Sequence, residues 1–243
     1  MREYLLFRLY GPLAAWGDIA VGEYRPSFAH PGKSAIIGLL AAALGIRRDE
    51  EDRQKSLAES CSFAARIDSM GVLLRDYHTT QVPSARKGVV HYTRRSELAT
   101  DDLNTILSSR DYRCDAAYTV AITVADGSPY SLQQLAAALI KPVFTLYLGR
   151  KSCPLSLPLQ PQVVSAATLC DVLESVPPAD ELSDIVQKSD AMVFWEDETA
   201  SGLERQQVIT RRDEPRSRRR WQFSERRESC GMLRKGEEPC TSA

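Results

Sequence analysis

The sequence of 243 residues contains few of the side chains from which metal centres are built. It has six cysteines and three histidines, and no two cysteines form a C-x-x-C pair. Zinc sites usually draw on closely spaced cysteine and histidine ligands. We therefore expect no metal site and no cofactor. We interpret the cysteines as reduced thiols, most of them small core residues.

Long apolar runs are also absent. The longest one, residues 35–46, has twelve residues, whereas a membrane-spanning helix needs about 20. The first residues, Met1 to Tyr4, lead directly into a strand-like pattern without the architecture of a signal peptide. The prediction is a cytoplasmic protein with no membrane contact, in which residues 35–46 belong to a buried helix.

An overall excess of one charge is lacking too, since the formal net charge is −1, but the charges are unevenly distributed. Residues 171–198 carry nine acids and one base, a local net of −8. Residues 205–235 carry eleven bases and four acids, a local net of +7, and residues 75–95 carry five bases and one acid. Such blocks create local charged surfaces even when the total cancels. The basic blocks favour nucleic-acid contacts, and solvated surface is the alternative.

The periodicity of apolar residues, with glycine and proline at the breaks, predicts a β-α-β-β-α-β order. Ferredoxin-like and RRM-like modules have this order, so the predicted class is α+β. The second helix opens with a capping box from Ser131 to Gln134. The expected strands are residues 4–10, 61–67, 72–77, 117–125 and 143–148, and the expected helices are 34–45 and 131–139.

Two regions fall outside this regular pattern. The segment 78–113 is too long for an ordinary hairpin loop, so we expect it to be functional or to contain a hairpin of its own. Residues 1–158 then form the RRM-like domain with this insertion. Beyond Pro158 the apolar pattern loosens. Residues 159–243 are expected to form an irregular extension, partly packed on the first domain and rich in arginine after 205.

The stretch 147–155 is the most informative part of the chain. A strand-like segment that includes Tyr147 ends at Gly149, which lets the backbone turn and lets a ligand approach closely because it has no Cβ. Three polar residues follow where the strand gives way to a loop: Arg150, Lys151 and Ser152. These groups suit an anion such as a phosphate. The alternative is a hairpin turn whose cations are simply solvated.

Gly32, Lys33 and Ser34, at the predicted helix start, are similar to the end of a phosphate-binding P-loop. The complete motif needs a glycine five residues before Gly32, and that position is Ser27. Nucleotide hydrolysis therefore has little support. Lys33 and Ser34 still lie at a positive helix terminus that suits one phosphate of a polyanion. Simple capping by Ser34 is the alternative.

Aromatic rings and cations are interleaved in and beside the segment 78–113. Such rings stack on bases and such cations neutralise phosphates in proteins that bind single strands. The sheet lacks the RRM aromatic motif, so we expect RNA to contact loops rather than the sheet face. His78, His91 and Lys87 also supply proton-transfer groups for a metal-independent endoribonuclease, the enzymatic alternative. The interleaved residues are Tyr77, His78, Arg86, Lys87, His91, Tyr92, Arg94 and Arg95.

Six stretches form a recognisable set when taken together. They are Gly11-Pro12-x-x-Ala15-Trp16-Gly17, Ser34-x-x-x-Gly38-Leu39-Leu40-x-Ala42-x-Leu44-Gly45-Ile46-x-Arg48, Arg75-Asp76-Tyr77-His78-Thr79, Cys114-Asp115-Ala116-x-Tyr118-Thr119-Val120-Ala121, the stretch 147–155, and Arg212-Asp213-Glu214-Pro215. In this order, over most of residues 1–225, the chain resembles the CasD family, the single-copy RAMP subunit of type I-E CRISPR Cascade complexes. The helix start, residues 31–37, and the segment 81–109 depart from the family pattern.

The resemblance implies an RRM-like fold with a protruding β-hairpin thumb, here residues 78–113. It also implies a subunit that grips the 5′ handle of the CRISPR RNA and bridges the backbone subunit CasC and the large subunit CasA. Such a subunit meets target DNA only indirectly. It does not cut RNA, because cleavage of the precursor belongs to another subunit, CasE.

On this interpretation each group of candidate residues has a role. Gly149, Arg150 and Lys151, with Ser152, hold handle phosphates, and Tyr147 or Tyr77 packs a base or sugar. Lys33, Arg47 and Arg48 extend the positive surface, and Arg86, Lys87, Arg94 and Arg95 steer the RNA. We expect Trp221 and Phe223 to pin the arginine-rich stretch onto the core. Helix 34–45 and the acidic block 171–198 are candidate subunit contacts. A scaffold that contacts only proteins is a further alternative.

Overall fold

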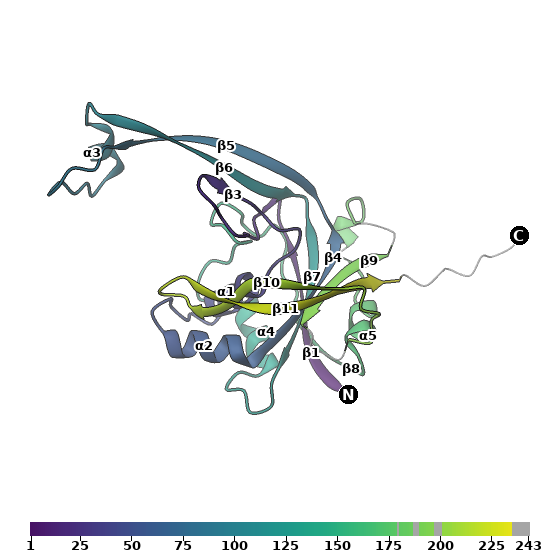
Figure 1. The fold of residues 1–243 in the computed structure, drawn as a ribbon. Helices are drawn as coiled ribbons and strands as arrows, with labels where there is room; N and C mark the ends of the chain where they lie inside the picture. Colours follow the sequence, from purple (N-terminus) through teal and green to yellow (C-terminus); the bar gives the residue numbers. More distant parts are fainter. Residues whose placement is uncertain (179, 187–189, 197–200, 235–243) are drawn as a thin grey trace, which may run out of the picture.

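The computed structural model describes residues 1–178, 180–186, 190–196 and 201–234. Their main feature is a seven-stranded sheet in the order β10-β11-β9-β4-β7-β1-β8 (Figure 1). Every neighbouring pair in it is antiparallel, and helices cover it, so the class is α+β. Its strands are β1 (Arg2–Tyr10), β4 (Cys61–Ser69), β7 (Ala117–Val124), β8 (Gln162–Ala166), β9 (Ala191–Glu196), β10 (Gln207–Ser217) and β11 (Gln222–Leu233).

Both faces of the sheet are buried, as strand β1 illustrates. Successive side chains of a strand point to opposite faces. Leu5, Phe7 and Leu9 lie in the main hydrophobic cluster, together with buried residues of three helices, whereas Tyr4 and Leu6 lie in a second cluster with α5. The helices are α1 (Lys33–Ala43), α2 (Glu51–Ser60) and α4 (Leu132–Ile140) on the first face, and α5 (Leu169–Glu174) on the second; a short 3-10 helix, η1, spans Asp180–Leu182.

The two predicted helices are present with nearly the expected bounds. Helix α1 ends at Ala43, and Gly45 just after it has a φ of +74°, a conformation that favours glycine. Helix α4 begins after Ser131, whose hydroxyl oxygen accepts a hydrogen bond from the Gln134 N–H at 3.1 Å. The capping signal in the sequence therefore located this helix correctly.

The expected closing strand, residues 143–148, is wrong. This segment runs along α1, where the Val143 and Phe144 N–H groups donate to the Ala43 and Ala42 carbonyls. The edge of the sheet is instead β8, which pairs with β1. The apolar pattern of residues 143–148 reflects packing on a helix, and a short apolar run does not distinguish this from a strand.

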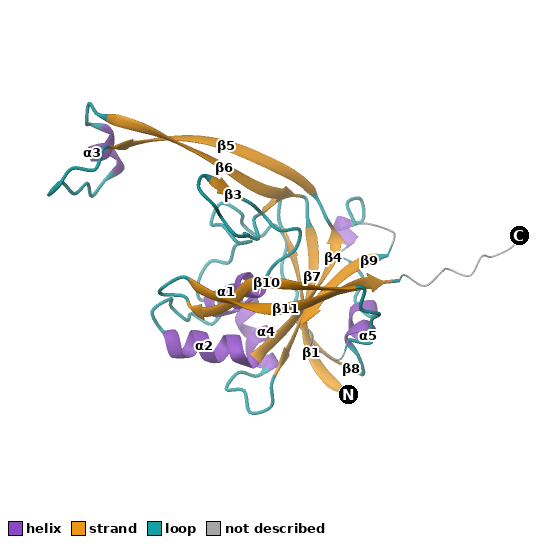
Figure 2. Ribbon diagram, in the orientation of Figure 1, coloured by secondary structure: helices purple, strands orange, loops and turns teal. Residues whose placement is uncertain are grey.

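The prediction of an irregular extension after residue 158 is also wrong. Strands β8 to β11 and helix α5 come from this region, and β9 joins the sheet beside β4. Strands β10 and β11 form a hairpin at the edge of the sheet that passes over α1 and α2 (Figure 2). The arginine-rich stretch is therefore largely regular β structure: Cys230 and Leu233 are buried in the core, while Arg212 and Arg216 are exposed.

A long two-stranded ribbon projects from the sheet (Figure 1). Strands β5 (Val72–Pro83) and β6 (Leu103–Cys114) pair continuously from Val72↔Cys114 to Pro83↔Leu103. Twelve residues per strand give a ribbon about 40 Å long. The expected strand 72–77 is thus the first half of β5. Helix α3 (Arg94–Leu98) lies at the far end, and β2 (Leu13–Ala14) and β3 (Tyr24–Arg25) pair with β6 near the base.

Candidate nucleic-acid interface

The loop that follows Tyr147 is tightly held by the rest of the chain. Tyr147 forms an isolated antiparallel bridge with Pro154, and the Leu148 N–H donates to the Cys153 carbonyl at 2.8 Å. Gly149 has a φ of +84°, and a Cβ there would overlap the carbonyl oxygen of Ala15. The glycine is therefore required by the close approach of the protein's own backbone, and not by a ligand as the sequence had suggested.

Arg150 fastens this loop to the base of the ribbon. Its guanidinium donates to the Asp111 carbonyl at 3.3 Å and to the Arg25 carbonyl at 3.2 Å. It also lies over the ring of Tyr112, 4.7 Å from the centroid. Lys151 and Ser152 are exposed, and Lys151 has no ion-pair partner among the residues described. The loop thus presents the exposed ammonium of Lys151 beside the guanidinium of Arg150, which is held by hydrogen bonds.

The base of the ribbon carries an aromatic and charged cluster of its own. The Arg75 guanidinium donates to both carboxylate oxygens of Asp111, at 2.9 and 3.2 Å, and lies 4.9 Å from the ring centroid of Tyr24. The Tyr24 hydroxyl donates to the same carboxylate. Because Asp111 is also within electrostatic range of Arg150, this one buried acid lies between the cations of the loop and those of the ribbon.

These contacts fix the protonation of the cluster. The hydrogen bond from Arg75 lowers the pKa of the Asp111 carboxyl, against the opposing effect of its burial. The hydrogen bond to Asp111 raises the pKa of the Tyr24 hydroxyl. Asp111 is therefore ionised and Tyr24 neutral near pH 7. The exposed parts of the cluster are the Tyr24 ring, at 39 % exposure, and the Arg75 side chain, at 56 %.

The predicted residues of the ribbon are exposed and spread along its length. Tyr77 is 62 % exposed on β5, and the Nδ1 atom of the next residue, His78, lies 3.2 Å from the Asp76 carboxylate. Arg86 lies 3.8 Å from Asp102, and Arg94 bonds Glu97 and the Gln81 carbonyl. Lys87 and Arg95 are exposed near the far end. His78 pairs with Ser108 in mid-ribbon, while Lys87 and His91 follow the end of β5.

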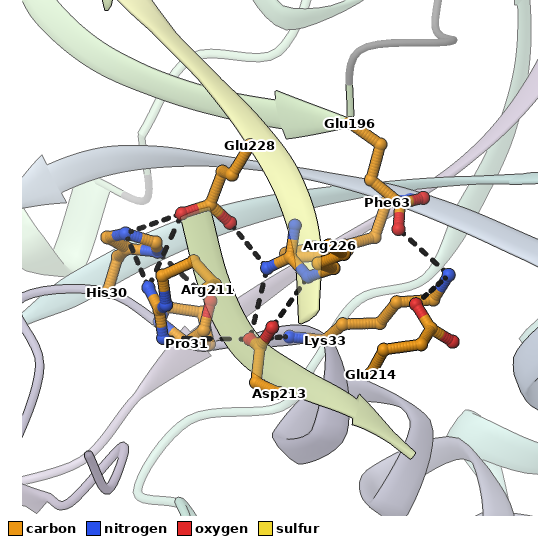
Figure 3. Close-up of polar contacts among 10 residues, drawn as sticks. All are labelled: His30, Pro31, Lys33, Phe63, Glu196, Arg211, Asp213, Glu214, Arg226 and Glu228. Atoms are coloured by element: carbon orange, nitrogen blue, oxygen red, sulfur yellow. Dashed lines mark hydrogen bonds and ion pairs between the residues drawn. The ribbon is translucent and has the colours of Figure 1, made fainter. Parts of the chain in front are cut away.

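The start of α1 differs most from the prediction (Figure 3). Lys33 is only 8 % exposed, and its ammonium contacts Glu196 at 2.8 Å and Glu214 at 2.9 Å. The Lys33 N–H donates to the Asp213 carboxylate at 2.8 Å. The positive end of the helix therefore binds a carboxylate from β10, and Lys33 does not extend an exposed positive surface. Ser34 does not cap the helix, since the N-cap position is Gly32.

Arg47 and Arg48 are exposed, as predicted for a positive surface. The Arg48 guanidinium lies 4.8 Å from the ring centroid of Trp221, in the turn between β10 and β11. Trp221 is 58 % exposed, so the expectation that it pins the arginine-rich stretch onto the core is wrong. Phe223 is half-buried and meets Trp221 edge-on at 5.7 Å.

Comparison with known proteins shows the family. The model of the family described as "CRISPR-associated protein (Cas_Cas5)" matches residues 4–228. The chain belongs to the Cas5 family. It is 39 % identical over 168 residues to the CRISPR system Cascade subunit CasD of Escherichia coli strain K12, a match that covers 65 % of this chain and 70 % of that protein. The resemblance found in the sequence is thereby confirmed.

Solved structures similar to this Cas5 chain match nearly all of it. A chain of a structure titled "CRISPR RNA-guided surveillance complex" has a TM-score of 0.66 and 26 % identity, covering 95 % of this chain and 90 % of that one. Another, titled "Crystal structure of Cas protein", has a TM-score of 0.65 and 28 % identity, covering 96 % and 95 %. The C-terminal strands are thus included in the similarity.

Sequence reasoning missed several groups that this Cas5 chain places at the ribbon base. No clear sequence pattern indicates a functional role for Tyr24, Arg25 or Asp111, which lie at the base of the ribbon. Arg75 belongs only to one of the stretches shared with the family. Arg25 before Pro26 was a weak local signal, but nothing near Asp111 in the sequence indicates its three partners. Among the residues described, no cluster of three or more metal-ligating side chains is present, and no helix is long and apolar enough to cross a membrane.

Proposed function

We propose that this Cas5 chain is a CRISPR RNA-binding subunit of a Cascade surveillance complex that grips the 5′ handle of the RNA without cutting it. The observation that carries the proposal is the loop 149–152 packed on the base of the ribbon. There Arg150 and Arg75 flank Asp111, the Tyr24 ring is open to solvent, and Lys151 is unpaired among the residues described. Exposed rings beside cations suit an unpaired nucleic-acid strand.

The architecture supports a ferredoxin-like module with a thumb. Within the sheet, β4-β7-β1-β8 are neighbours, with α1 and α2 between β1 and β4, and α4 between β7 and β8. This is the strand order and connection pattern of a ferredoxin-like β-α-β-β-α-β unit. The ribbon β5–β6 is inserted between β4 and β7, and we assign it as the thumb. The cations of the ribbon then contact the RNA beyond the loop 149–152. They include Arg86, Lys87, Arg94 and Arg95.

Two relatives support the choice of partners. The curated relative is a Cascade subunit, and one structural neighbour belongs to an RNA-guided surveillance complex. We propose that this chain contacts the backbone subunit CasC and the large subunit CasA. The ribbon offers exposed apolar side chains for such contacts, among them Val72, Leu73 and Ile106. The acidic block 171–198 is also a proposed contact with another subunit. Residues 179, 187–189 and 197–198 of this block lie outside the described residues.

Salt dependence of RNA binding tests the RNA interface directly. The logarithm of affinity falls with the logarithm of salt concentration by about 0.7 per phosphate contact on a single strand. Lys151→Ala should therefore make the slope shallower by about 0.7, and Arg150→Ala with Lys151→Ala by about 1.4. The measurement is a titration of CRISPR repeat RNA at several salt concentrations.

Arg2→Ala is the matched control, because it also removes one exposed cation. Arg2 begins β1, and the N-terminus lies away from the ribbon in Figure 1. The slope of this variant should equal that of the unmodified chain. Since Lys151 is exposed and makes no described ion pair, its replacement leaves the fold intact. If Lys151→Ala and the double variant both leave the slope unchanged, the loop is not part of an RNA site and the proposal fails.

A further inference from the structure

The turn between β10 and β11 displays an exposed tryptophan in an uncommon backbone conformation. Trp221 has a φ of +57°, which bulky residues seldom adopt. Its side chain is 58 % exposed, whereas Trp16 and Trp195 are 6 % and 3 % exposed. One side of the indole lies against Arg48, at 4.8 Å. The turn thus exposes a large aromatic ring to solvent and keeps this residue in an unfavourable backbone conformation. Such strained conformations are typical of functional positions.

Arg218, in the same turn, is a half-buried cation without an acidic partner among the residues described. It donates to the Ser34 carbonyl and lies over Gly38, where a Cβ would be 3.3 Å from its nearest nitrogen. Its Nε atom is buried and has no described hydrogen-bond partner. Burial and the neighbouring charge of Arg48 lower the pKa of Arg218 to about 10. A half-buried cation with an unpartnered donor, beside the exposed cation Arg48, favours the binding of an anion.

This cluster adjoins the interface described above. Tyr147, which is 37 % exposed and begins the stretch that carries Arg150 and Lys151, lies within electrostatic range of Arg218. In Figure 1 the β10–β11 turn and the far end of the ribbon extend toward the same side of the sheet. Tyr147 therefore links the loop 149–152, which it precedes, to the surroundings of Arg218 in the turn.

The composition of the cluster favours RNA over a protein partner. Arg218, Arg219 and Arg220 are consecutive, and Arg48 contacts the same turn through Trp221. Protein–protein contacts also use arginine and tryptophan, but consecutive arginines beside an exposed ring match sites for single strands, which combine several cations with rings that stack on bases of any sequence. Glu51, which contacts the last residue of β10, accepts a hydrogen bond from the Ser217 hydroxyl.

We propose that Arg48, Arg218 and Trp221 form a second contact for single-stranded RNA, with a phosphate between the two guanidiniums and a base stacked on the indole. This inference rests on the proposed function, since it extends the path of the same RNA. It assigns to the C-terminal hairpin a direct role in binding in addition to its place in the sheet.

Tryptophan fluorescence provides the first test, because Trp221 is the exposed member of the three tryptophans. A titration of the full chain with CRISPR repeat RNA should quench emission, and Trp221→Phe should remove most of the quenching. Base stacking on a ring contributes about 1–3 kcal/mol, so Trp221→Ala should weaken binding by about 5- to 150-fold.

Arg218→Met keeps most of the packing volume and removes the charge, and it should make the salt slope shallower by about 0.7. Thermal unfolding of this variant separates binding from folding. If Arg218→Met and Trp221→Ala leave RNA affinity and slope unchanged, the inference is wrong, whether or not Arg218→Met lowers the melting temperature. The same result with impaired co-purification of other Cascade subunits would assign the turn to protein contact instead.

The outcomes distinguish this inference from the proposed function. A shallower slope in Lys151→Ala, with unchanged binding in both turn variants, overturns only the second contact. Unchanged slopes in Lys151→Ala, in the double loop variant and in the turn variants overturn both. Arg2→Ala again serves as the control for removal of one exposed cation distant from both sites.

Discussion

At the start of α1, a carboxylate from β10 occupies the place where the sequence suggested a phosphate. Asp213 accepts the Lys33 N–H and forms an ion pair with Arg226 at 2.7 Å, and Arg226 also contacts Glu228 at 2.6 Å. His30 completes the buried network through Glu228, 3.3 Å away (Figure 3), and its ring is stacked on Phe194 with centroids 3.7 Å apart. Individual residues here hold together segments about 180 positions apart.

Asp213→Ala should therefore destabilise the fold strongly. Removing one member of a buried ion pair leaves its partner charged and unpaired, at a cost of about 3–5 kcal/mol. Denaturation by urea measures the change. Glu59→Gln is the control, because Glu59 forms only an exposed pair with Lys55 and should change stability by less than about 0.5 kcal/mol. Similar midpoints for the two variants would contradict the structural role of Asp213.

Glu228 makes the same network sensitive to acid. Burial opposes its ionisation, but the hydrogen bond with His30 and the charges of Arg226 and Arg211 lower its pKa from 4.5 to about 2. A carboxyl with a lowered pKa in the folded state stabilises the protein above its unfolded pKa, and this contribution is lost as the pH falls from about 4.5 to about 2.

The expected contribution of Glu228 is about 3 kcal/mol. Unfolding free energies measured from pH 6 down to pH 2.5 should fall steeply for the unmodified chain. Glu228→Gln should be less stable at pH 6 and should show a shallower decline. An equally steep decline in both proteins would mean that other carboxyls account for the acid sensitivity.

At the scale of elements, two β-hairpins extend from one sheet and differ in how they are held. The hairpin β10–β11 is packed on α1 and α2 and joins the sheet through β9. Among the strands that the structure describes, the ribbon β5–β6 is paired only with itself and with the short strands at its base. No residue from 84 to 102 is buried, so the far end of the ribbon does not contribute to the core.

Replacement of residues 84–102 by Asn-Gly should therefore leave the fold intact. Pro83 and Leu103 are directly paired, and Asn-Gly forms the two-residue turn that such a pair needs. We expect a melting temperature within a few degrees of the original and weaker binding of CRISPR RNA. In a full-length variant Arg86, Lys87, Arg94 and Arg95 are changed to Ala. This variant keeps the length of the ribbon and removes its charge, so it shows which of the two properties RNA binding requires. Unchanged affinity in both variants would exclude a steering role.

At the scale of the whole molecule, the proposal is a chain that holds RNA and does not cut it. The enzymatic alternative uses His78, His91 and Lys87. His78 lies in mid-ribbon, paired with Asp76, while the other two follow the end of β5. A concerted acid–base reaction requires such groups within hydrogen-bond reach of one bond. The described contacts bring none of the three together.

End-labelled CRISPR repeat RNA should consequently remain intact after incubation with the purified chain in EDTA, while staying bound to it. His78→Ala should behave in the same way. A specific cut by the unmodified chain that disappears in His78→Ala would overturn the non-catalytic assignment. Co-purification with CasC, CasA and CRISPR RNA is the corresponding test of assembly.

The amino-acid sequence alone determined the elements whose signals are local. Helices α1 and α4, strands β1 and β7 and the family follow from periodicity, capping residues and motifs. Local signals succeed there because a helix or strand buries its own apolar side chains with a fixed period. The ambiguous apolar run 143–148 lacked such a distinguishing period, and packing on α1 decided its conformation.

Only the tertiary structure decided which charges remain available to a ligand. Lys33 and Lys151 look alike in the sequence, yet Lys33 is enclosed by Glu196 and Glu214, which come from β9 and β10, while Lys151 is exposed. Tertiary packing also buried Asp111 and left Trp221 exposed to solvent. These outcomes depend on contacts between distant parts of the chain, and the free energy of a charge depends on those neighbours, which no local pattern specifies.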